Sequence, residues 1–160
     1  MHLTVRFKYW FFENYWWLLC LAVLGSTATL FLIKEQVATV ATVVGVLLSI
    51  AYFLQKQKLE EMRLFREIFK ECNARYDSMN EQLASIALKE YEQITPEERG
   101  KIVDYLNLCG EEYLYFKRGY IDISVWTAWH SGMKAMEIKP SIRSVWETEK
   151  KTNSYYDLPL

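Results

Sequence analysis

Apolar residues are concentrated near the start of the chain in two unbroken segments of equal length. Residues 15–33 (YWWLLCLAVLGSTATLFLI) and residues 37–55 (VATVATVVGVLLSIAYFLQ) contain no Asp, Glu, Lys or Arg over 19 positions each. A helix of this length spans about 28 Å at a rise of ~1.5 Å per residue, close to the ~30 Å hydrocarbon thickness of a bilayer. Each segment is therefore predicted to be a transmembrane helix.

Three residues, Lys34, Glu35 and Gln36, separate the two segments, which leaves room only for a tight turn. The pattern predicts an antiparallel transmembrane hairpin over residues 15–55. A buried hairpin in a soluble protein is the first alternative, but the rest of the chain is too short to cover two such helices. A cleaved signal peptide is the second, and bulky rings before the apolar run together with the immediate second segment argue against it.

The Lys and Arg residues that flank the segments predict the orientation. Arg6, Lys8 and the terminal amine precede the first segment, and Lys34 is the only basic residue between the two. A larger group follows the second segment: Lys56, Lys58, Arg63, Arg66 and Lys70. Because basic residues are enriched on the cytoplasmic side of membrane proteins, both termini are predicted to be cytoplasmic.

An aromatic stretch precedes the first apolar segment. In residues 7–17 (FKYWFFENYWW) eight of eleven side chains are aromatic. They could form a stacking surface for nucleic-acid bases, a core segment or a membrane anchor, and the adjoining apolar segment favours the anchor. Residues 1–14 are predicted to be an interfacial segment that forms a short amphipathic helix. The predicted anchors are Trp10, Tyr15, Trp16 and Trp17, whose rings suit the headgroup region.

Small residues recur at every fourth position of the second apolar segment, at Ala41, Gly45 and Ser49. Small side chains at this spacing let transmembrane helices approach closely. In one interpretation, the favoured one, this face receives the first helix of the same hairpin. In the other, it also meets further copies of the chain and forms a homo-oligomer.

Residues 56–94 are predicted to continue the second helix as a cytoplasmic stalk. Apolar residues recur there with alternating gaps of three and four: Met62, Phe65, Phe69, Cys72, Tyr76, Met79, Leu83 and Ile86. We take Phe65, Phe69, Tyr76 and Leu83 to represent this seam, which is typical of a helix that packs against other helices. A second stripe at Leu64 and Ile68 widens it, so a bundle contact is at least as well supported as a two-stranded dimer.

Residues 95–151 are predicted to form a small helical bundle, followed by a tail at 152–160 whose order the sequence leaves open. Thr95 and Pro96 are suited to begin one helix, Asp122 or Ser124 a second, and Pro140 a third. No segment shows the alternation of apolar and polar residues that is typical of a strand. The whole chain is therefore predicted to be all-α.

Composition and motifs narrow the chemistry. The net charge of −1 excludes a strongly basic nucleic-acid binder, so no direct nucleic-acid contact is expected and the lipid bilayer is the first partner. No nucleophile, phosphate-loop or metal-ligand motif is present in the sequence, and no catalytic residue, metal or cofactor is predicted. Glu111 or Glu112 could act as an acid or base, but a buried polar contact is the more usual role for such a residue.

The region from Tyr105 to Trp146 resembles the C-terminal helical domain of a family of small bacterial membrane-tethered proteins of uncharacterised function. The resemblance lies in the order of features: Asn107, Glu111, Glu112, Gly119, Ile121, Asp122, Val125, Trp126, Pro140 and Trp146. Residues 73–80 (NARYDSMN) are similar to the family's stalk. Members with this layout resemble the two-transmembrane effectors of retron-type anti-phage systems.

The resemblance implies an effector of the bacterial inner membrane. It would be held inactive by a reverse transcriptase with its RNA-linked DNA and would damage the membrane on release. The alternative is a non-toxic membrane-anchored scaffold that recruits a soluble partner through the bundle. In that case Tyr120, Trp126 and Trp129 are candidate contact residues, although aromatic residues at such spacings more often belong to a core.

Overall fold

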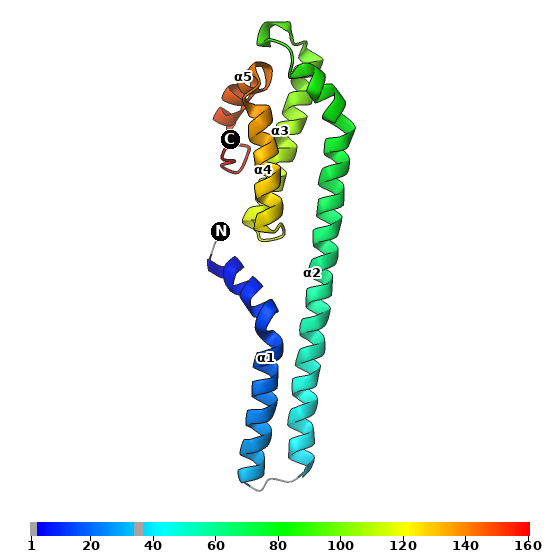
Figure 1. Ribbon diagram of the computed structural model, residues 1–160, viewed down its shortest axis with the longest axis vertical. Helices are drawn as coiled ribbons and strands as arrows, with labels where there is room; N and C mark the ends of the chain where they lie inside the picture. Colours follow the sequence, from blue (N-terminus) through cyan, green and yellow to red (C-terminus); the bar gives the residue numbers. More distant parts are fainter. Residues whose placement is uncertain (1–2, 34–36) are drawn as a thin grey trace. The chain divides into compact units, whose positions relative to one another are not determined.

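The computed structural model describes the backbone of residues 3–33 and 37–160 and, in the first helix, the side chains of Phe7 and of residues 10–32. Its elements in chain order are α1 (Leu3–Leu32), α2 (Val37–Ile86), η1 (Tyr91–Gln93), α3 (Pro96–Lys117), α4 (Ile123–Glu137), α5 (Pro140–Glu149) and η2 (Lys150–Thr152) (Figure 1). The described residues include no strand, which confirms the all-α prediction for them.

The chain divides into two compact units, Met1–Arg63 (unit 1) and Leu64–Leu160 (unit 2). The division falls inside α2, which is continuous from Val37 to Ile86. The residues predicted as a stalk, 56–94, therefore do not form a unit of their own. From Leu64 onward they belong with the residues predicted as the bundle.

Unit 1 contains α1 and the first part of α2. The predicted interfacial segment, residues 1–14, is not a separate element where the structure describes it, because α1 begins at Leu3 and continues to Leu32. Figure 1 shows the first turns of α1 inclined to the rest of the helix. Lys58 Nζ donates a hydrogen bond to the Phe12 carbonyl oxygen at 3.5 Å, which links α2 to α1. The turn at residues 34–36 and the side chains of Arg6 and Lys8 lie outside the described residues.

Unit 2 has one buried core, to which the last part of α2 contributes. Leu83 and Ile86 of α2 are 0% and 2% exposed, and the helices that follow complete the core around them. The other core residues are Ile68, Cys72, Ala87, Ile102, Tyr105, Leu106, Leu108, Cys109, Ile121, Trp126, Met133, Ile142, Val145, Trp146, Tyr155 and Leu158. The apolar seam of α2 therefore packs against other helices of the same chain.

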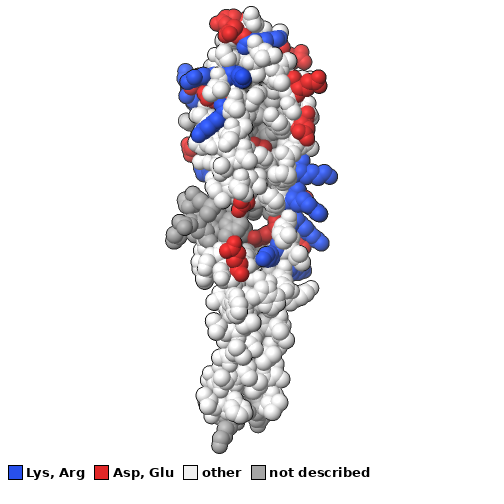
Figure 2. All heavy atoms as spheres, in the orientation of Figure 1, with Lys and Arg blue, Asp and Glu red and all other residues white. Residues whose placement is uncertain are grey.

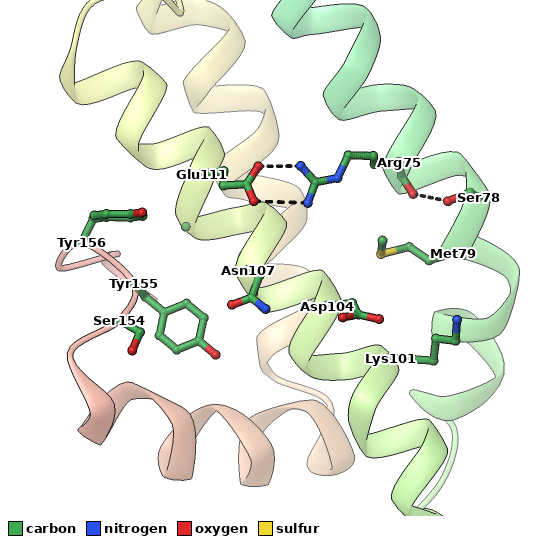
Figure 3. A pocket seen from close by; sticks show the side chains of 11 residues that line it. Arg75, Ser78, Met79, Lys101, Asp104, Asn107, Glu111, Ser154, Tyr155 and Tyr156 are labelled. Atoms are coloured by element: carbon green, nitrogen blue, oxygen red, sulfur yellow. Dashed lines mark hydrogen bonds and ion pairs between the residues drawn. The ribbon is translucent and has the colours of Figure 1, made fainter.

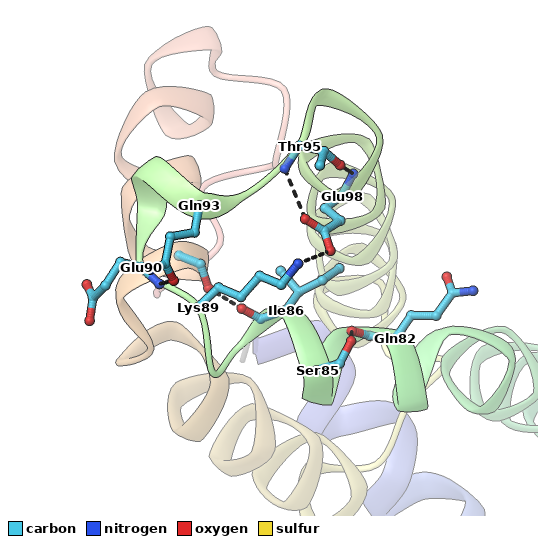
Figure 4. A network of polar contacts seen from close by, with 9 residues as sticks. Gln82, Ser85, Ile86, Lys89, Glu90, Gln93, Thr95 and Glu98 are labelled. Atoms are coloured by element: carbon cyan, nitrogen blue, oxygen red, sulfur yellow. Dashed lines mark hydrogen bonds and ion pairs between the residues drawn. The ribbon is translucent and has the colours of Figure 1, made fainter.

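A polar network stabilises the connection between α2 and α3 (Figure 4). Thr95 is the N-cap of α3, and a capping box pairs its hydroxyl with the Glu98 amide and the Glu98 carboxylate with the Thr95 amide. Lys89 forms an ion pair with Glu98 at 2.6 Å, and its hydrogen bond lowers the pKa of that carboxyl. The buried Ser141 hydroxyl donates to the Ile86 carbonyl oxygen at 2.9 Å. These contacts satisfy helix-end groups that would otherwise lack partners.

The later helices begin where the sequence signals predict. Asp122 is the N-cap of α4 and accepts hydrogen bonds from both the amide and the hydroxyl of Ser124, and Pro140 is the first residue of α5. Between α3 and α4 the chain reverses at Gly119, whose φ of 75° lies in the left-handed region that glycine adopts without a steric cost.

The C-terminal tail is part of unit 2. Tyr155 and Leu158 are 5% and 6% exposed in its core. The Trp146 indole donates to the carbonyl oxygen of Leu160 at 3.3 Å, and Lys117 Nζ donates to that of Tyr156 at 3.1 Å. The order of residues 152–160, which the sequence left open, is thus explained by packing against α3 and α5.

Candidate functional site

The apolar segments of unit 1 present an uncovered hydrophobic surface. By length and composition, Trp10–Leu32 and α2 are both candidate membrane spans, and only 11% and 6% of their most apolar 18-residue windows are buried. Leu24, Phe31 and Val37 are 68%, 82% and 85% exposed. Figure 2 shows an uncharged surface over residues 15–33 and 37–55, whereas charged groups lie over the rest of α2 and over unit 2. A core helix of a soluble protein would be mostly covered, so this surface is suited to lipid or to other apolar helices.

Three of the four predicted anchors have the exposure that contact with a membrane interface requires. Trp10, Trp16 and Trp17 are 51%, 52% and 74% exposed. The prediction for Tyr15 needs correction, because this side chain is only 3% exposed and its ring lies against that of Trp16, with centroids 5.3 Å apart. Tyr15 therefore acts as a packing residue, which its place in an aromatic run could not reveal.

The small-residue face of α2 is open. Ala41, Gly45 and Ser49 are exposed, and a Cβ added at Gly45 would meet nothing within 4 Å. Gly45 and Ser49 line a shallow apolar groove along the helix with Thr42, Val46, Ile50 and Phe53. The Ser49 hydroxyl donates to the Gly45 carbonyl oxygen at 2.9 Å and is satisfied within its own helix.

The interpretation in which α1 covers this face is therefore wrong for the described structure. The less exposed positions of α2 in unit 1 lie on another side of the helix and carry mostly larger side chains: Val40, Val43, Val44, Leu47, Ala51 and Leu54. Larger side chains offer more contact area within the chain. As a result, the small residues stay accessible.

The predicted stalk seam packs inside unit 2. Leu83 is fully buried, Phe65 and Tyr76 are partly buried against the core, and Phe69 stacks on Trp129 with ring centroids 5.6 Å apart. The sequence left a bundle and a dimer open, and these contacts within one chain correspond to the bundle.

The three residues predicted to contact a soluble partner differ in solvent exposure, and one of them belongs to the core. Trp126 is 6% exposed and stacks on Phe116 at a centroid distance of 5.1 Å, so it is corrected to a core residue. Trp129 is partly buried. Tyr120, at 38% exposure, remains available at the surface.

A polar groove of about 460 Å³ lies in unit 2 between α2, α3 and the C-terminal tail (Figure 3). Arg75 and Glu111 form a bidentate ion pair in it, at 2.5 and 3.3 Å, and Lys101 and Asp104 add one charge of each sign. Interleaved charges of this kind suit hydrogen bonding to a polar surface. Among the described residues, no group of three or more His, Cys, Asp or Glu side chains could hold a metal ion.

Glu112 differs from its neighbour Glu111. Its side chain is 7% exposed, and burial, with a smaller contribution from Glu111, raises its pKa to about 8, although Arg75 acts in the opposite direction. The sequence left open which of the two glutamates faces inward. Helical spacing could have identified Glu112 as the inward-facing one. It lies three residues after Cys109 and seven after Tyr105, which places it on the same helix face as these two core residues.

Comparison with protein-family models, with curated proteins and with solved structures gives no match for this chain.

Proposed function

We propose that the chain is a two-span membrane protein in which residues 15–33 and 37–55 cross the bilayer as an antiparallel hairpin. The observation that carries this proposal is the near absence of cover on two helices that are long and apolar enough to span. In water, so large an uncovered apolar surface would drive aggregation. In a bilayer it needs no further cover, because lipid chains are as apolar as the side chains they meet.

In the proposed orientation both termini are cytoplasmic. Lys56, Lys58 and Arg63 follow the second segment directly, as the positive-inside tendency requires of a cytoplasmic end. They are also placed to attract anionic headgroups. Unit 2, which carries most of the charged residues, then lies in the aqueous phase.

Within this topology, we propose an effector of the bacterial inner membrane that belongs to a retron-type anti-phage system. A partner complex keeps it inactive, and the resemblance alone points to a reverse transcriptase with RNA-linked DNA as that partner. On release, copies associate through the face formed by Ala41, Gly45 and Ser49 and permeabilise or depolarise the membrane. The openness of this face supports the association step, because two helices can approach closely there without displacing a side chain.

Expression in bacteria with a membrane-potential dye tests this activity, and alkaline extraction of the membranes tests the topology separately. We expect the chain to resist extraction, and we expect loss of potential and growth arrest when it is produced without its neighbouring genes. A chain released by alkali would overturn the membrane proposal. An extraction-resistant chain with normal potential and growth would overturn only the effector proposal.

Replacing Gly45 with leucine is expected to leave insertion intact and to reduce depolarisation at least tenfold. The added side chain would fill the groove where a second helix must approach. The dye signal and the cross-linked oligomer are measured at matched expression levels.

The matched control for this variant is Gly25→Leu, which makes the same change in α1 at a glycine whose Cβ position is also open. It should remain active. Equal activity of wild type and Gly45→Leu would remove the α2 face from the mechanism, and equal loss in both variants would show that the effect is not specific to this face.

The second candidate function is a non-toxic scaffold that recruits a soluble partner to the membrane. The observation that favours it is the open polar groove beside Arg75 and Glu111, with Tyr120 as a further exposed contact on unit 2. A partner that is captured by the wild type and lost on Arg75→Ala, in cells with normal membrane potential, would support the scaffold over the effector.

A further inference from the structure

A second cavity in unit 2 lies between α2, α3 and α4, is partly open to solvent and has an aromatic wall. Its volume is about 200 Å³, below the ~300–1,000 Å³ that is usual for drug-sized ligands, so it suits a smaller molecule. The side chains that give it chemical character are Asn73 and Tyr76 of α2, Tyr105 and Glu112 of α3, and Trp129 of α4.

Glu112 carries the one carboxyl group among the residues that line this cavity, and this group has no hydrogen-bond or ion-pair partner there. More than nine-tenths of the residue is buried, yet its carboxylate makes no hydrogen bond or ion pair with any described residue. Among the described residues no fully buried side-chain oxygen lacks a hydrogen-bond partner, so both oxygens of this carboxyl retain some contact with solvent. Ionising a buried carboxyl without a partner is costly, which raises its pKa, and a positive charge that enters beside it lowers this cost.

The groups around Glu112 do not supply that positive charge. From α2, Arg75 is the nearest cation, but it is committed to the bidentate pair with Glu111. The other titratable groups near this carboxyl are cysteines and the tyrosines Tyr76 and Tyr105, which carry no positive charge in either protonation state. Burial raises the pKa of Cys72 to about 12 and those of Tyr105 and Cys109 well above their usual range. The lining from α4 consists of Ala128, Trp129, Gly132 and Met133, none of which titrates.

We propose that this cavity binds a small organic ammonium ion, which pairs with the Glu112 carboxylate and lies against the rings of Tyr76, Tyr105 and Trp129. Aromatic faces attract cations, and they do so most strongly where water is excluded. An inorganic metal ion fits less well, because such ions require several oxygen ligands and prefer carboxylates, whereas the cavity offers one carboxyl group, one amide and two phenol hydroxyls. The site lies wholly within unit 2 and does not depend on the proposed membrane activity.

Choline is the probe, and 3,3-dimethyl-1-butanol is its neutral control. The two have the same shape, but the branched centre is a positively charged nitrogen in choline and an uncharged carbon in the control. Binding is measured by calorimetry on the full chain in a nonionic detergent. We expect one choline per chain and at least tenfold weaker binding of the neutral analogue. Equal affinity for the two compounds, or no choline binding, would overturn the proposal.

Two leucine substitutions locate the site. Gly132 lies in the cavity wall, and Gly100 is exposed on α3 outside the cavity. At either position an added Cβ would meet nothing within 4 Å. Both variants should therefore fold. Gly132→Leu is expected to fill the cavity and abolish binding, whereas Gly100→Leu should bind as the wild type does. Unchanged binding in Gly132→Leu would place the ligand elsewhere and refute the assignment.

The dependence on pH identifies the charged partner. Because the pKa of Glu112 is about 8, the carboxyl is protonated at lower pH, and it must lose this proton before choline can pair with it. Affinity should rise about tenfold per pH unit between pH 6 and 8 and level off above, and Glu112→Gln should bind at least tenfold more weakly than wild type at pH 8 without this slope. A flat profile in the wild type, or the same slope in the variant, contradicts the role of Glu112.

The same ammonium chemistry occurs in free compounds and in choline lipid headgroups. Repeating the titration with the chain in bilayers of anionic lipid, with and without phosphatidylcholine, separates these sources. Competition by phosphatidylcholine would identify the headgroup as the ligand. Unchanged affinity would identify a free ammonium compound.

Discussion

Replacing Leu83 with alanine is expected to lower the free energy of unfolding of unit 2 by about 3 kcal/mol. Leu83 is 0% exposed in the core where the end of α2 meets the later helices. Truncating a fully buried leucine removes its transfer free energy and leaves a cavity that the neighbours fill only in part, a combined cost of roughly 2–5 kcal/mol. This loss is a large share of the ~5–15 kcal/mol that stabilises a typical domain.

The measurement is amide hydrogen exchange of unit 2 in detergent, because the apolar helices of unit 1 need not unfold with it. Leu88→Ala is the matched control, since this leucine lies only five residues away and is 86% exposed. It should change the free energy by less than about 0.5 kcal/mol. Equal effects of the two substitutions would mean that α2 does not pack as described.

Glu112→Gln is expected to make unit 2 less sensitive to pH between about pH 5 and 8. The folded pKa of about 8 lies above the ordinary value of 4.5, so the folded state holds this proton more tightly than the unfolded chain does. The contribution of this group to stability is therefore fully present below about pH 4.5 and is lost as the pH rises to 8. The full shift corresponds to on the order of 4–5 kcal/mol.

Other carboxyls act in the opposite direction and at lower pH. Hydrogen bonds lower the pKa values of Glu98, Asp122 and Glu147, whose contributions are lost only as the pH falls below about 4.5. The window from pH 5 to 8 thus separates the effect of Glu112 from the effects of these three carboxyls. Thermal midpoints across this window should slope downward in the wild type and much less in Glu112→Gln.

The exposed carboxylate of Glu81 on α2 provides the control, and Glu81→Gln should retain the wild-type slope. Equal slopes in Glu112→Gln and the wild type would show that folding does not raise the pKa of Glu112. That result would also contradict the poorly solvated carboxyl on which the proposed ammonium site depends.

Helix limits and the apolar segments could be predicted from the sequence because their causes are local. Thr95 and Pro96 begin α3, and Pro140 begins α5, through hydrogen bonds and backbone angles that involve only neighbouring residues. The two uncharged stretches identify candidate spans by length and composition alone. Periodicity likewise placed Leu83 on a packing face.

The tertiary structure was needed to show which neighbouring residues cover a given side chain. Periodicity assigns residues to one face of a helix, but what covers that face depends on segments distant in the sequence. Only the packed structure shows that Tyr15 and Trp126 are buried, that Gly45 is open, and that Glu112 faces a cavity while Glu111 pairs with Arg75. The sequence by itself established an all-helical chain with two apolar segments and a charged remainder, because these depend on local composition. The core, the open face and the unpaired carboxylate depend on contacts between distant residues, so they follow from tertiary packing.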